Sequence, residues 1–175
     1  SHGKTTTTSL VASISENGNL DPTVINGGVI KAYGSNARLG EGDWMIVEAD
    51  ESDGSFEFVH PNIAIFTNLE EEHMDFYGTL ENLLSKFQVF MDRVVDSGGQ
   101  MIINNDDFNL SQLIKRFRKG SKDNDSIITF GIDSKADVQA KDIKYRATDV
   151  TFKLYYKDDF QDDITLNVFG KHNIY

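Results

Sequence analysis

The 175 residues suffice for one domain of ordinary size, and a hydrophobic fraction of 39% is enough to form a buried core. This composition excludes a disordered tail, and the absence of cysteine from the sequence excludes thiolate metal sites and a cysteine nucleophile. With 28 acidic and 17 basic residues the formal net charge is −11, which disfavours partners such as nucleic acids and anionic membranes. No stretch approaches the roughly 18 apolar residues of a membrane span. We therefore expect a cytoplasmic globular protein, and we leave its oligomeric state open.

The first part of the chain predicts one helix and then three strands. Apolar residues recur at helical spacing between Thr5 and Glu16, and Asn17-Gly18-Asn19 is a typical stop signal. Three apolar runs follow, and their composition is typical of strands buried on both faces of a parallel sheet. These runs are Pro22–Ile25, which ends at Asn26-Gly27-Gly28, then Asp43–Glu48, and Asn62–Thr67.

The second part predicts two amphipathic helices, two more strands and a change of pattern. Thr79 is the expected N-cap of a helix that ends at Gly98-Gly99, and a second apolar stripe runs from Leu110 to Phe117. Residues 100–103 and 127–130 predict strands, whereas alternation from Ala136 onward predicts antiparallel hairpins. We therefore predict an α/β fold, with a mostly parallel sheet flanked by helices and a small antiparallel addition near the C-terminal end.

Gly3-Lys4-Thr5-Thr6 has the composition of the last part of a phosphate-binding loop. Glycine lets the backbone approach an anion, the amides at a helix N-terminus face it, and lysine offsets charge on the outer phosphates. The threonine hydroxyl is a magnesium ligand in such loops. A threonine-rich segment that only caps a helix is the alternative, and the tripeptide Gly-Lys-Thr does not decide between the two.

Four carboxylates lie at the end of the second predicted strand, at Glu48, Asp50, Glu51 and Asp53. Magnesium prefers oxygen ligands, and open α/β sheets bind ligands at the carboxyl ends of their strands. A solvated acidic loop is the alternative interpretation. A phosphate loop together with a strand that ends in carboxylates is what a magnesium nucleotide requires, so each feature supports the other.

His73 follows the third predicted strand, and we expect it at the same sheet edge as Glu48. An imidazole there is a candidate ligand for a metal or a phosphate oxygen, and a surface histidine in an acidic loop is the alternative. His60, which precedes Pro61, has the character of an ordinary surface histidine.

Five segments in this order resemble the Mur ligases, and among them the alanine-adding branch. They are Ser1–Thr8, Asn36–Gly40, Glu48–Asp53, Thr67-Asn68 together with His73–Asp75, and Gly170–Asn173. The resemblance implies that residues 1–175 form the central, phosphate-loop ATPase domain of a three-domain bacterial enzyme, trimmed at both ends. The domain for the UDP-sugar and the C-terminal Rossmann-like domain would lie outside it.

The resemblance also implies a reaction and a set of roles. ATP phosphorylates the lactyl carboxylate of UDP-N-acetylmuramate, and the amine of L-alanine then displaces phosphate to form an amide. Lys4, Glu48 and His73 resemble the catalytic residues, and Thr5, Glu48 and His73 resemble the ligands of Mg²⁺. The residues that resemble the ATP-binding set are Gly3, Lys4, Thr5, Thr6, His172 and Asn173.

The sequence departs from the family pattern in three respects and leaves three alternatives open. The first glycine of the phosphate loop and the strand that precedes the loop are not among these 175 residues. Glu72 stands where the family usually has aspartate, and Gln88 aligns with a lysine that some relatives carbamylate, with Lys86 offset from it. A nucleotide-switch module is one alternative, although the Asn-Lys dipeptide of a guanine-reading motif does not occur in the sequence. The others are a nucleotide-binding fragment without activity of its own, and a sister Mur or folylpolyglutamate-type ligase.

Overall fold

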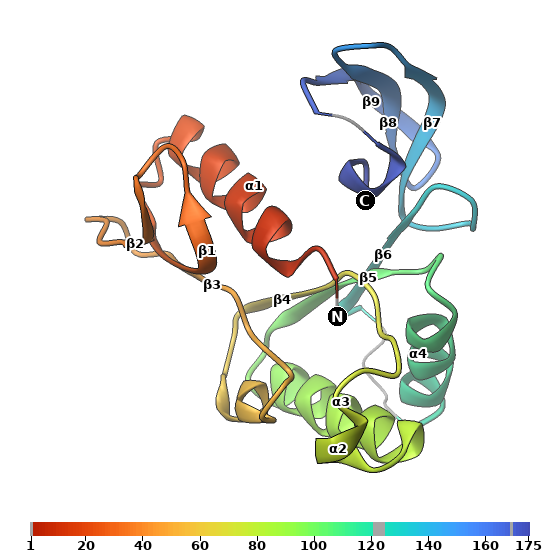
Figure 1. Cartoon of the computed structure of the whole chain (residues 1–175). Coiled ribbons are helices and arrows are strands. Elements are labelled where there is room, and N and C mark those ends of the chain that lie inside the picture. The colour runs from red at the N-terminus through yellow and green to blue at the C-terminus, as the bar shows by residue number, and fades with distance from the viewer. Residues whose placement is uncertain (1, 121–124, 169) are drawn as a thin grey trace. The chain divides into compact units, whose positions relative to one another are not determined.

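The computed structural model describes residues 2–120, 125–168 and 170–175 (Figure 1). Its contacts divide the chain into two compact units, Ser1–Phe56 and Glu57–Tyr175. The strands form two separate sheets, one of three strands in the first unit and one of six strands in the second. Among the described residues, no helix is both long and apolar enough to cross a membrane.

The first unit packs one helix against a small mixed sheet. Helix α1 contacts the central strand β1 and its parallel neighbour β3, and β2 pairs antiparallel with the other edge of β1. Ala12 and Val24 are fully buried between helix and sheet, so they form the centre of this core. The elements are α1 (Lys4–Asn17), β1 (Thr23–Ile30), β2 (Ser35–Arg38) and β3 (Met45–Val47).

The sequence predicted α1 correctly but not the extent or burial of these strands. β1 continues through the glycines that were expected to end it, because it pairs with β2, a strand that the sequence did not predict. β3 is shorter than predicted, and Met45 and Val47 are 57% and 41% exposed. The expectation of burial on both faces is therefore wrong here, since the described part of this unit has one helix to cover the sheet.

The second unit confirms the predicted fold class. Strands β4, β5, β6 and β7 run parallel in that order, and β8 and β9 add antiparallel strands to the same sheet. The bounds are β4 (Ile63–Phe66), β5 (Gln100–Asn104), β6 (Ile127–Gly131), β7 (Val138–Tyr145), β8 (Val150–Tyr156) and β9 (Asp159–Leu166). Ala64 and Phe66 of β4 are buried whereas Ile63 and Ile65 are 45% and 40% exposed, so β4 too is covered on one face and not on both as predicted.

Two amphipathic helices supply the core of this unit. Helices α3 (Leu80–Asp96) and α4 (Phe108–Gly120) pack against each other and against β5, as Figure 1 shows. Thr79 caps α3 as predicted, because its side-chain oxygen accepts a hydrogen bond of 3.2 Å from the amide of Asn82. The shorter elements are α2 (Met74–Tyr77) and the 3₁₀ turns η1 (Ser55–Phe58) and η2 (Lys171–Asn173).

Candidate functional site

The predicted phosphate loop leads directly into α1. Gly3 has a φ of +80°, a left-handed conformation that glycine adopts without a steric penalty, and the helix begins at Lys4. The amides in the first turn of a helix have no acceptor within that helix, and the helix dipole favours negative charge there. The backbone therefore presents donors suited to an anion beside the side chains of Lys4 and Thr5.

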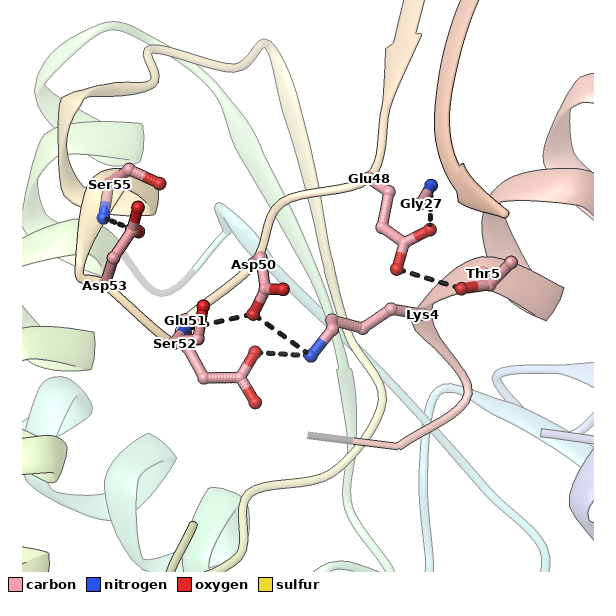
Figure 2. A network of polar contacts seen from close by, with 9 residues as sticks. All are labelled: Lys4, Thr5, Gly27, Glu48, Asp50, Glu51, Ser52, Asp53 and Ser55. Carbon is pink, nitrogen blue, oxygen red and sulfur yellow. Dashed lines mark hydrogen bonds and ion pairs between the residues drawn. The ribbon is translucent and has the colours of Figure 1, made fainter. Parts of the chain in front are cut away.

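The hydroxyl of Thr5 meets the carboxylate of Glu48, which directly follows β3 (Figure 2). Thr5 Oγ1 donates to Glu48 Oε1 at 3.0 Å, and the amide of Gly27 on β1 donates to Glu48 Oε2 at 2.7 Å. Neighbouring oxygens around octahedral Mg²⁺ lie about 3 Å apart, because each Mg–O bond is about 2.1 Å long. The spacing of these two oxygens therefore fits a pair of magnesium ligands.

Gly27 is a site residue that the sequence analysis missed. A Cβ atom at position 27 would lie 2.9 Å from both carboxylate oxygens of Glu48, closer than van der Waals contact allows. The absence of a side chain at Gly27 thus lets the Glu48 carboxylate approach the backbone of β1. The sequence signal was a pair of glycines inside an apolar β run, a pattern that often marks a close approach to the backbone.

Lys4 forms an ion pair with Glu51 rather than extending into solvent. Lys4 Nζ lies 2.6 Å from Glu51 Oε2 and 3.7 Å from Asp50 Oδ1, and the side chain of Glu51 is only 6% exposed. Burial alone would lower the pKa of Lys4, but the hydrogen bond and negative charge of Glu51 outweigh it and raise this pKa. Lys4 is therefore a cation at neutral pH, and a phosphate that binds it competes with Glu51.

The four predicted carboxylates do not act as one cluster. Glu48 faces Thr5, whereas Asp50 and Glu51 face Lys4 (Figure 2). Asp53 accepts a hydrogen bond of 2.9 Å from the amide of Ser55, and hydrogen bonds from the side chain and the amide of Ser55 lower the pKa of Asp53. Of the four carboxylates, Glu48 is therefore the one beside Thr5, which agrees with its selection from the sequence as the candidate magnesium ligand.

His73 lies in the second unit, at the start of α2. Its φ is +56°, an uncommon value for a residue other than glycine, and its side chain is exposed. The expectation that His73 and Glu48 share one sheet edge is wrong, because β3 and β4 belong to different sheets. A joint role of these two residues remains a prediction.

His172 and Asn173 lie in η2, also in the second unit. The ring of His172 packs over Gly170, where a Cβ atom would come within 2.5 Å of Cε1 of that ring. Gly170 also has a φ of +92°, a conformation that glycine adopts without a steric penalty. The lack of a side chain at this position therefore permits both this backbone conformation and the close approach of the His172 ring.

The chain matches the Mur ligase middle domain over residues 1–175 and belongs to that family. A relative from Jannaschia sp. (strain CCS1), a UDP-N-acetylmuramate–L-alanine ligase, is 44% identical over 99% of this chain and 36% of its own length. The chain therefore spans little more than a third of that relative.

Two solved structures have the same fold. The first is a UDP-N-acetylmuramate:L-alanyl-γ-D-glutamyl-meso-diaminopimelate ligase from Neisseria meningitides, with a TM-score of 0.81 and 26% identity over 99% of this chain and 55% of that one. The second is the MurF ligase from Thermotoga maritima in complex with ADP, with a TM-score of 0.70 and 18% identity over 99% of this chain and 40% of that one. This family membership favours the ligase over the nucleotide-switch alternative.

Proposed function

We propose that the protein carrying this chain is an ATP-dependent ligase that joins L-alanine to the lactyl carboxylate of UDP-N-acetylmuramate. The products are the amide, ADP and phosphate, and the reaction belongs to peptidoglycan precursor synthesis in the bacterial cytoplasm. The observation that carries the proposal is the convergence of Thr5 and Glu48, 3.0 Å apart, beside Lys4 at the N-terminus of α1. The ligase names of the relatives supply the reaction type.

Each residue of the proposed site has a role that follows from its chemistry. Lys4 binds the outer phosphates of ATP, and the backbone of Gly3, Thr5 and Thr6 donates hydrogen bonds to them. Thr5 and Glu48 hold Mg²⁺, which when bound neutralises charge that grows on the transferred phosphoryl group.

Two further roles belong to the second unit. His73 offers its imidazole to a second Mg²⁺, and its exposed position leaves the ring accessible. His172 and Asn173 border the adenine base. These assignments come from the resemblance of the two segments to the Mur ligases, so each needs its own variant as a test.

Phosphate release by the complete protein tests the proposed function. The assay supplies ATP, Mg²⁺ and UDP-N-acetylmuramate, with and without L-alanine. Release that requires both substrates establishes the ligase, and replacement of L-alanine by glycine or L-serine grades its specificity. Folded protein that releases no phosphate, or releases it without regard to the sugar nucleotide, contradicts the proposal.

A sister ligase is the second candidate, because the Neisseria structure that shares this fold is named for a peptide substrate. The same assay separates the two when L-alanine is replaced by the tripeptide L-alanyl-γ-D-glutamyl-meso-diaminopimelate. Faster phosphate release with the tripeptide than with L-alanine would favour the sister activity.

Substitution of Gly27 by alanine tests whether Glu48 is the magnesium ligand. The new methyl group is expected to push the Glu48 carboxylate away from Thr5, because Cβ would lie 2.9 Å from both of its oxygens. The Mg²⁺ concentration for half-maximal ligation should rise at least about tenfold, because the displaced Glu48 carboxylate can no longer bind Mg²⁺ together with Thr5. The variant should keep the wild-type fold, because the flexible side chain of Glu48 can move away from the new methyl group at little cost in free energy.

Gly120→Ala is the matched control, since a Cβ atom at position 120 meets no other atom within 4 Å. It should leave the Mg²⁺ dependence unchanged. An unchanged Mg²⁺ dependence in Gly27→Ala as well would remove Glu48 from the proposed metal site.

A further inference from the structure

The carboxylate of Asp106, just after β5, gathers four donors from two separate segments of the second unit. Its Oδ2 accepts hydrogen bonds from the amides of Ile132 at 2.6 Å and Asp133 at 2.9 Å, and from the hydroxyl of Tyr175 at 3.0 Å. Its Oδ1 accepts a hydrogen bond from the amide of Ser134. One side chain therefore ties the loop after β6 to the end of the segment Gly170–Tyr175.

Asp106 is itself held in place by its neighbours. Its amide donates to Asn104 Oδ1 at 2.9 Å, and Asn105 Nδ2 donates to the carbonyl of Lys135 at 2.8 Å. Gly131 makes room for the carboxylate, because a Cβ atom there would lie 3.0 Å from Asp106 Oδ1. The residues that follow β5 thus form a rigid support at the carboxyl end of the sheet.

The protonation states of Asp106 and Tyr175 favour the hydrogen bond between them. Burial would raise the pKa of Asp106, but the backbone amides of Asp133, Ile132 and Ser134 outweigh it and lower this pKa, so the group is a carboxylate at neutral pH. Burial and the hydrogen bond to Asp106 raise the pKa of Tyr175, so its hydroxyl keeps the proton that it donates. The contact is a charge-assisted hydrogen bond, which is stronger than a neutral one.

A second anchor of the same segment is weaker. Lys171 Nζ lies 2.6 Å from Asp133 Oδ2, but the two side chains are 48% and 68% exposed. Exposed ion pairs contribute little to stability. The ring of Tyr175 also packs near Phe130, with ring centroids 6.4 Å apart. Of these contacts, the partly buried, charge-assisted hydrogen bond from Tyr175 to Asp106 is the stronger anchor.

We propose that Asp106 and Tyr175 are positioning residues for ATP, because together they hold the segment on which His172 and Asn173 lie. The inference rests on the proposed function, since it takes those two residues as the border of the adenine site. Without the Tyr175 hydroxyl, η2 would be held to the loop after β6 by the exposed Lys171–Asp133 ion pair, and its position would be less firmly fixed.

Tyr175→Phe in the complete protein is the direct test. The substitution removes the hydroxyl and keeps the ring beside Phe130 and the bonds of Asp106 to its loop. The KM for ATP is expected to rise about tenfold, the size expected when a hydrogen bond to a charged group is lost. The KM for L-alanine should stay unchanged. Tyr156→Phe, the same change at the end of β8, is the matched control and should alter neither constant.

Asp106→Asn is the second variant. An asparagine oxygen can replace only one of the two carboxylate oxygens, and the amide NH₂ then faces either the N–H of Ser134 or those of Ile132 and Asp133. The KM for ATP is expected to rise more than in Tyr175→Phe. If the wild-type protein is active and both variants fold but have the wild-type KM for ATP, this inference is overturned and the proposed function stands. A wild type without ligase activity overturns the proposed function and this inference with it.

Discussion

Replacement of Lys4 by methionine in the complete protein is expected to reduce ligation at least about 100-fold. The methionine keeps most of the length of the side chain but removes the ammonium that we assign to the outer phosphates of ATP. Loss of one group that stabilises charge in a transition state typically costs about 100- to 1,000-fold in rate. Phosphate release at saturating L-alanine and UDP-N-acetylmuramate, with ATP varied, measures the effect.

The ion pair with Glu51 complicates this test, and the structure supplies its control. Removal of Lys4 leaves the buried Glu51 carboxylate without its ammonium partner 2.6 Å away, which is expected to destabilise the first unit. The double variant Lys4→Met/Glu51→Gln removes both charges, so it should recover thermal stability without recovering ligation. A double variant that ligates at the wild-type rate would remove Lys4 from the mechanism.

The three long helices α1, α3 and α4 could be predicted from the sequence because local signals determine them, whereas the four-residue α2 was not predicted. The α3 helix has an N-cap at Thr79, apolar residues at helical spacing and glycines after its end, and the structure contains all three features. The strands β5 and β6 were also predicted to within one residue, since each is a short apolar run between polar turns.

The strand β2 could not be predicted, because tertiary contacts stabilise it. Ser35–Arg38 has no alternation of apolar and polar residues, and its pairing with β1 supplies the hydrogen bonds. Arg38 also pairs with Glu16, in the last turn of α1, at 3.0 Å and with Asp21, which follows that helix. Only the folded chain brings these groups together.

The site was predicted in its residue types but not in its pairings. The sequence indicated that Lys4, Thr5 and Glu48 belong to one site, and the structure brings them together in the first unit. It did not reveal that Glu51 pairs with Lys4 or that Gly27 supports Glu48, because both depend on distances across β1, β3 and α1. Composition identifies which groups can bind a phosphate or a metal, whereas pairing depends on the fold.

His73 is expected to be as important to ligation as Lys4, for a reason visible in its backbone. Its φ of +56° is uncommon for a residue other than glycine, although histidine adopts such values more often than most residues, and its side chain is exposed. Strained residues of this kind are frequent at functional sites. We therefore expect the imidazole to act on the reacting groups.

His73→Asn separates the backbone from the imidazole. Asparagine tolerates a left-handed conformation, so this variant should fold with nearly wild-type thermal stability, whereas His73→Ala adds backbone strain. Both variants should lose at least about 100-fold in ligation, and both should need more Mg²⁺, if the ring is a metal ligand. His60→Ala removes another exposed histidine of the same unit and should leave phosphate release unchanged. Near-normal ligation by His73→Asn would show that this position serves only the turn before α2, and the second magnesium would then need a different ligand.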